Sequence, residues 1–218
     1  MNRNLFSIYL ILAVFEASGQ TCVHTDLSRA LLFKTEVTRV KRTEQAKEHG
    51  GYSDSCIVHV TVINKTTHKS VAVITYSTIF LYSPAFRKCN AARSYTTGAG
   101  QNADIKDYDY GDFIIADFNF DGKEDFAAKN DSGGNRGPTY NFYLQNGAGS
   151  FRLDNFLTEY MEHFPDRIDK AAKTLLLESD NGKWYFKNSY RLNTKNGKWQ
   201  ETKQTGTHGL SCSRRDGL

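Results

Sequence analysis

Oxygen-bearing side chains recur at the first, third and fifth positions of the stretch Asp117–Asp125. Ca²⁺ binds about 6–8 oxygen ligands, and a backbone that curls around the ion can supply them from alternate positions of a loop. Gly122, at the sixth position, permits the sharp turn that such a loop needs. The spacing therefore predicts a calcium site with these protein ligands: Asp117, Asn119, Asp121, the backbone carbonyl of Lys123, and Asp125.

The stretch differs from an EF-hand, because its twelfth position is Ala128, where an EF-hand has a bidentate Glu. Ile114, Ile115 and Phe126 on its flanks indicate strands rather than helices. Asp, Asn and Gly also favour turns through local hydrogen bonds, so an Asx-rich turn that caps a hairpin is the alternative. The three aligned oxygens, the glycine and the further Asp together favour calcium.

Much of the remaining chain consists of short runs rich in apolar and aromatic residues, which predict strands. Aromatic residues make up 13% of the chain, and Asn-Gly pairs supply hairpin turns. We expect a long hairpin over residues 57–81, an earlier strand over 31–40, a strand over 140–144, one helix over Leu157–Lys173, and a meander through 174–179, 184–192 and 199–203. The sequence thus predicts an all-β fold, mainly an antiparallel meander with hairpins like propeller blades, with one short helix and a calcium loop between strands.

The N-terminus has the features of a secretory signal peptide: Arg3 is basic, Leu5–Phe15 is apolar, and residues 17–19 form a small-residue cleavage site. The apolar run is too short to span a bilayer. We expect a periplasmic or secreted protein; attachment as a lipoprotein through Cys22 is the less favoured alternative, because the two preceding residues are not small. The expected divisions are a signal peptide (1–19), an N-terminal extension (20–55), a calcium-binding β domain (56–205) and a tail (206–218).

Four cysteines follow the signal peptide: Cys22, Cys56, Cys89 and Cys212. An even number of cysteines in an exported chain predicts two disulfides. Their spacing excludes a Cys-x-x-Cys zinc or redox pair. Three pairings are possible, and the sequence does not choose among them.

The net charge of +4 comes from 28 basic and 24 acidic residues, and so small an excess argues against a dedicated nucleic-acid surface. Motifs of serine hydrolases, zinc proteases, phosphate-binding loops and dinucleotide folds are missing from the sequence. Carboxylates at Asp104, Asp107, Asp109 and Asp112 could supply an acid and a base, but they are better explained as a solvated approach to the metal loop or as the source of its missing ligand. We therefore expect no enzymatic activity.

Asp117–Asp125, the Gly-rich loop Asn130–Pro138 and the strand Tyr140–Leu144 together resemble a family of calcium-binding bacterial periplasmic proteins. Characterised members are immunity proteins that inhibit a lysozyme-like peptidoglycan hydrolase delivered by an antibacterial type IV secretion system. The resemblance extends from about Cys56 to Thr205. It implies Ca²⁺ as cofactor and a peptidoglycan hydrolase as partner, whereas the metal motif alone is shared with integrin-type FG-GAP repeats.

The Gly-rich loop is the expected inhibitory element, because it begins five residues after Asp125 and a bound ion would fix its base. Its expected partner-binding residues are Asn135, Arg136 and Tyr140. Arg136 could meet the catalytic carboxylates that lysozyme-like hydrolases pair across their clefts, and Tyr140 could insert as an aromatic plug. The alternative for Tyr140 is a place inside the sheet.

A calcium-dependent adhesion or carbohydrate-binding module is the second functional hypothesis. In such a module, exposed aromatic rings would stack on sugars. Trp184 and Trp199 distinguish the hypotheses: burial within the meander favours the inhibitor, and exposure side by side favours the carbohydrate-binding module.

Overall fold

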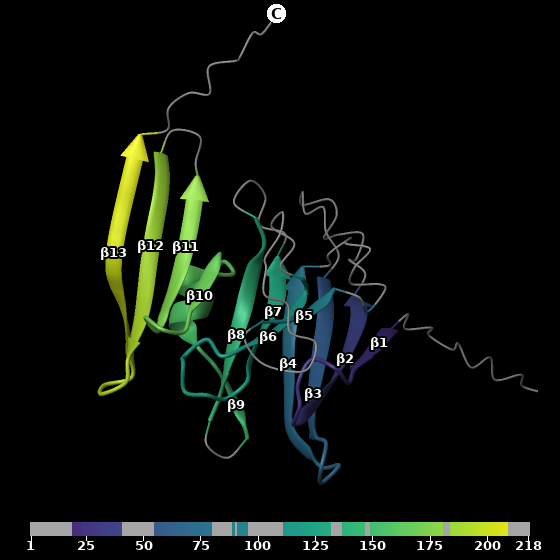
Figure 1. The fold of residues 1–218 in the computed structure, drawn as a ribbon. Helices are drawn as coiled ribbons and strands as arrows, with labels where there is room; N and C mark the ends of the chain where they lie inside the picture. The colour runs from purple at the N-terminus through teal and green to yellow at the C-terminus, as the bar shows by residue number, and fades with distance from the viewer. Residues whose placement is uncertain are drawn as a thin grey trace, which may run out of the picture.

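The computed structural model describes residues 19–40, 55–79, 89, 91–95, 111–131, 137–146, 149–180 and 184–208. Residues 1–18 of the predicted signal peptide lie outside this part of the chain. So do Asp104, Asp107, Asp109 and the tail beyond His208. Strands predominate in the described residues, and they form three sheets (Figure 1). The all-β prediction is therefore confirmed.

The N-terminal sheet is an antiparallel meander of β1 (Gly19–His24), β2 (Leu31–Val40), β3 (Ser55–Asn64) and β4 (Ser70–Ile79). Buried positions alternate along β2 and β3, so one face of this sheet packs inward. The predicted long hairpin is confirmed as β3 and β4, and the predicted earlier strand as β2. Because β1 and β2 pair into the same sheet as β3, the expected division at residue 56 does not separate an extension from a domain.

The central sheet contains β5 (Ala92–Ser94), β6 (Phe113–Ala116), β7 (Asp125–Asp131), β8 (Thr139–Gln145) and β9 (Phe151–Leu153). The strand β5 runs parallel to β6, and the other neighbours are antiparallel. Every residue of β6 is buried. Its side chains alternate between two cores: Phe113 and Ile115 pack against the N-terminal sheet, and Ile114 and Ala116 pack on the opposite side. The central sheet is thus covered on both faces.

The C-terminal sheet is an antiparallel meander of β10 (Arg167–Asp169), β11 (Thr174–Asp180), β12 (Trp184–Asn193) and β13 (Lys198–His208). It covers the second face of the central sheet by placing Leu175 and Tyr190 in the core there. The turn between β12 and β13 contains the Asn196-Gly197 pair, and Gly197 has a φ of 66°. The predicted C-terminal meander is therefore confirmed.

The predicted helix over Leu157–Lys173 is wrong beyond its first turn. A π-helix, η2, covers only Phe156–Met161, and the next residue, Glu162, has a left-handed φ of 60°. Phe164 is buried in the same core as Met161 although it lies beyond the helix, which explains why the apolar spacing suggested a longer one. Among the described residues, no helix is long and apolar enough to cross a membrane.

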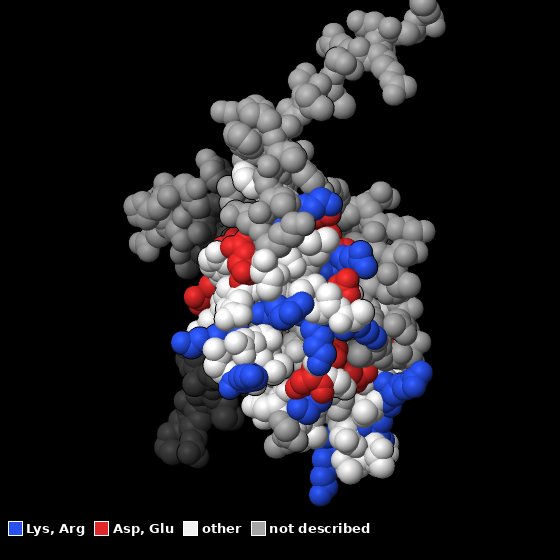
Figure 2. All heavy atoms as spheres, turned by 60° about the vertical axis from the view of Figure 1, so that its left-hand side comes forward, with Lys and Arg blue, Asp and Glu red and all other residues white. Residues whose placement is uncertain are grey.

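Basic and acidic side chains are interspersed on the face that includes the C-terminal sheet (Figure 2). Two ion pairs on this sheet illustrate the mixing: Lys187 Nζ lies 2.6 Å from Glu178 Oε1, and Arg167 lies 3.3 Å from Asp169. This mixture agrees with the near balance of basic and acidic residues in the chain, whose net charge is only +4.

Candidate metal loop

The stretch Asp117–Glu124 connects β6 to β7, and its alternate residues face opposite directions. Phe118 is fully buried and meets Phe142 edge-on at 5.1 Å, while Phe120 packs partly against the same core. The apolar side chains of the loop are therefore anchored inside. This anchoring leaves the oxygen-bearing side chains of Asp117, Asn119 and Asp121 on the other side, as the sequence predicts.

Two left-handed backbone positions curl the loop: Phe120 has a φ of 61° and Gly122 a φ of 85°. A Cβ atom added at Gly122 would meet no atom within 4 Å, so this position needs glycine for its dihedral angle and not for lack of space. The curl brings backbone N–H groups around the side-chain oxygens.

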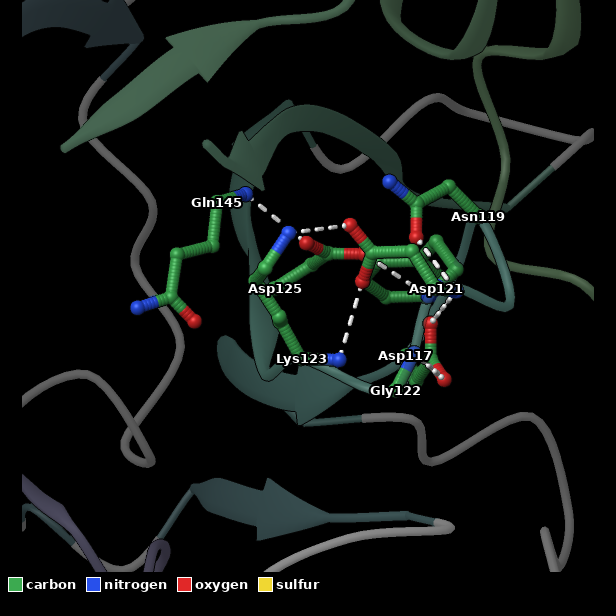
Figure 3. Close-up of polar contacts among 8 residues, drawn as sticks. Asp117, Asn119, Asp121, Gly122, Lys123, Asp125 and Gln145 are labelled. Carbon is green, nitrogen blue, oxygen red and sulfur yellow. Dashed lines mark hydrogen bonds and ion pairs between the residues drawn. The ribbon is translucent and has the colours of Figure 1, made fainter. Parts of the chain in front are cut away.

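The loop oxygens accept hydrogen bonds from these N–H groups (Figure 3). The two carboxylate oxygens of Asp117 accept from the amides of Asp121 at 3.1 Å and Gly122 at 3.0 Å. Asn119 Oδ1 also accepts from the Asp121 amide, at 3.0 Å. The Asp121 carboxylate accepts from the Lys123 amide and from the Lys123 ammonium, both at 2.9 Å. This network is the Asx-turn arrangement that the sequence offers as the alternative to calcium.

Asp125 is fully buried at the start of β7. Its oxygens accept hydrogen bonds from the amides of Phe118 at 2.9 Å and Gln145 at 2.8 Å, so it ties the loop to β8. Burial raises the pKa of Asp125 to about 8; the two amide donors oppose this increase, and the charges of Asp117 and Asp121 add to it. Burial likewise raises the pKa of Asp117, against hydrogen bonds from the loop amides.

The donor set fits a hard cation, because it consists of carboxylate, amide and carbonyl oxygens. Each side-chain oxygen has a second lone pair beyond the one that an N–H group occupies. In the described part of the chain, however, no group of three His, Cys, Asp or Glu side chains is arranged to hold a metal ion. The expected ligands also include Asn119 and the Lys123 carbonyl, which are not of these types. The calcium site stays a prediction, and Asp117, Asn119, Asp121, Lys123 and Asp125 are the residues that would form it.

The loop also contacts the turn between β1 and β2. The hydroxyl of Ser28, which is fully buried, donates to the carboxylate of Glu124. The Lys65 ammonium, from the turn between β3 and β4, donates to the carbonyls of Thr25, at 2.6 Å, and of Ser28. No local sequence pattern indicates this link, because the residues that form it are far apart in the chain.

The partner-binding residues have different outcomes. Asn135 and Arg136 lie outside the described residues. Tyr140 is only 1% exposed, packs beside Phe142 and Phe164, and donates its hydroxyl to the Gly111 carbonyl at 2.8 Å. The expectation of Tyr140 as a plug is therefore corrected: its side chain is part of the core, which was the alternative.

Cys22 and Cys89 form a disulfide. Cys56 is a buried free thiol, and burial raises its pKa to about 11. The expectation that all four cysteines form two bridges is corrected at Cys56, and Cys212 lies outside the described residues. A disulfide suits the oxidising compartment that a signal peptide implies.

Two further residues from the sequence analysis have defined surroundings. Asp112 is buried and its carboxylate lies 2.9 Å from the Lys129 ammonium, so it is not part of a solvated approach to the metal loop. Trp199 is partly buried, stacks on Phe156 at 5.7 Å, and donates its indole N–H to Asp154 at 3.2 Å. The side chain of Trp184 lies outside the described part.

Comparisons with protein-family models, curated proteins and solved structures found no match to this chain. The resemblance to the immunity-protein family is therefore unsupported by them and stays a prediction.

Proposed function

We propose that the protein is an exported calcium-binding protein that inhibits a lysozyme-like peptidoglycan hydrolase. The observation that carries the calcium part is the fully buried Asp125, whose pKa rises to about 8 through burial and the nearby charges of Asp117 and Asp121. A bound Ca²⁺ would neutralise these carboxylates. The disulfide between Cys22 and Cys89 supports export to an oxidising compartment.

The inhibitory part rests on the resemblance and on the position of the loop Asn130–Pro138. The first two residues of this predicted loop, Asn130 and Asp131, are the last two of β7, the strand that Asp125 begins. Asn130 is held to the N-terminal sheet, because the Thr78 hydroxyl of β4 donates to the Asn130 carbonyl. Since Tyr140 is buried, the inhibitory contacts would come from Asn135 and Arg136.

A lysis assay tests the proposal. Cell walls are treated with a lysozyme-like hydrolase and the protein, in calcium or in chelator. Wild type should inhibit, and Arg136→Ala should weaken inhibition by about 30-fold, the effect of losing an interface residue worth ~2 kcal/mol. Tyr160→Ala, at an exposed aromatic residue of η2, is the matched control and should inhibit normally. Failure of wild type to inhibit every hydrolase tested would remove the proposed function.

One observation favours the carbohydrate-binding alternative. Tyr160 is 61% exposed and stacks on Phe156 at 4.9 Å, which in turn stacks on Trp199. Exposed aromatic rings of this kind can bind the apolar face of a sugar. The same variant separates the two functions: Tyr160→Ala should abolish cosedimentation with insoluble peptidoglycan if the protein is a carbohydrate-binding module.

A further inference from the structure

A cavity of about 40 Å³ lies beside the Cys22–Cys89 disulfide, where the N-terminal sheet meets β6. Its apolar walls come from both sheets and from the segment after Cys89, and they include Val37, Val58, Ala92 and Phe113. Protein interiors contain few voids larger than a water molecule. One water needs about 10–15 Å³ on this measure, so the cavity has room for about three waters or a small organic group.

Polar side chains line the same cavity: His24, Thr35, Tyr76 and Asp112. Among the described residues, none is hydrogen bonded to the hydroxyl of Thr35 or of Tyr76. Each hydroxyl can donate one hydrogen bond and accept others. The cavity therefore offers hydrogen-bonding groups that the described protein does not use.

The cavity carries little net charge. Burial lowers the pKa of His24, against the opposing charge of Asp26, and its ring stacks on Phe113 at 5.9 Å, so the imidazole is neutral at neutral pH. The Lys129 ammonium, 2.9 Å away, compensates the carboxylate of Asp112. A charged ligand would lose its hydration here without gaining a counter-charge.

We propose that this cavity binds a small uncharged amide, such as the acetamido group of an N-acetylated sugar. The methyl group of an acetamide matches the walls at Val37 and Val58. Its carbonyl can accept from the hydroxyl of Tyr76 or Thr35, and its N–H can donate to an oxygen of the same lining. An alkyl group of equal size would leave the hydroxyls unused. The site shares no residue with the metal loop, so it goes beyond the proposed function and can fail independently of it.

Chemical-shift titration of the full oxidised chain tests the site. The probes are acetamide and N-acetylglucosamine, with acetate and glucosamine as charged controls. Saturable shifts of Thr35, Tyr76 and Phe113 resonances are expected with the amides and not with the controls. Tyr76→Phe, which removes one hydroxyl, should weaken binding by about 5-fold. Thr67→Val removes a hydroxyl from an exposed residue in the turn between β3 and β4 and should bind as wild type.

A cavity-filling variant keeps the test decisive. Val37→Leu adds a methylene to the wall and should abolish the shifts while the far-ultraviolet circular dichroism stays native. If Tyr76→Phe does not fold, Thr35→Val removes the other hydroxyl and should give a similar loss. Absence of saturable shifts with both amides, equal binding of acetate, or unchanged binding by Val37→Leu would each overturn the proposal.

Discussion

Two buried acids lie at opposite ends of the hairpin formed by β6 and β7. Asp112 immediately precedes β6, and its carboxylate is paired with the ammonium of Lys129 from β7 at 2.9 Å. Asp125 opens β7 opposite Ala116, and its carboxylate accepts only backbone N–H groups among the described residues. The exposed fractions are similar, 7% for Asp112 and 0% for Asp125.

The difference lies in how each buried charge is offset. Taking a carboxylate out of water is costly unless a counter-charge or strong hydrogen bonds replace the water. The hairpin supplies its own cation to Asp112. It supplies no ion pair to Asp125, and Lys123, the nearest basic residue of the loop, pairs with Asp121 at 2.9 Å. A proton or a metal cation can offset the buried negative charge of Asp125. For this reason we propose calcium at Asp125 and not at Asp112.

Removal of the Lys129 cation should have the largest effect on stability. In Lys129→Met, Asp112 keeps its buried charge without its main counter-charge, and the free energy of unfolding should fall by about 3 kcal/mol. Urea denaturation measures the change. The double variant Lys129→Met/Asp112→Asn should recover most of the loss, because the buried charge is then gone as well. Equal stability of the single and double variants would mean that the ion pair does not offset the burial of Asp112.

Calcium binding should have the next largest effect on stability, and this effect should depend on the loop residues near Asp125 and not on Asp112. At a 100-fold excess over Kd, Ca²⁺ should stabilise wild type by roughly 2.7 kcal/mol. Asp121→Ala and Asp125→Asn should abolish this increase. Asp112→Asn should keep the full increase despite its lower starting stability. Melting in calcium and in chelator measures all four proteins, and identical curves for wild type would remove the metal site.

The strands and the direction of the loop side chains could be read from the sequence because both follow a period of two. The same period of two predicts that the side chain of Tyr140 is buried. Tyr140 alternates with Phe142 and Leu144, and all three side chains lie in one core. The plug hypothesis overlooked this. A strand residue that alternates with buried residues is a core residue unless the register breaks.

Other features depend on contacts that no local pattern records. The pairing of Cys22 with Cys89 spans 67 residues and requires β1 to lie beside the segment before β5. The ion pair of Asp112 with Lys129 depends on the register of β6 against β7, in which Phe113 lies opposite Ala128. The sequence does not indicate that η2 ends at Met161, because Phe164 continues the apolar spacing beyond the helix.

The smallest expected effect is a pH dependence at the Asp112 end, from His24. Burial lowers the pKa of His24 in the folded protein below the ordinary histidine value of about 6.5, so between these two pKa values the unfolded chain binds more protons than the folded one. His24 therefore contributes stability above pH 6.5 that is lost as the pH falls through that window. The charged or titratable groups around it are Asp26, Asp112 with Lys129, and Tyr76.

The measurement is the difference in the free energy of unfolding between wild type and His24→Gln at several pH values from 5 to 8. This difference should change below pH 6.5 and stay constant above it. Using the difference cancels the opposite trend from Asp125, whose raised pKa makes the metal-free protein less stable as the pH rises. His68→Gln, in the turn between β3 and β4, serves as an exposed control. A difference that does not vary with pH would show that His24 is equally protonated in the folded and unfolded chains. The stability of the region around Asp112 would then respond neither to protons nor to calcium.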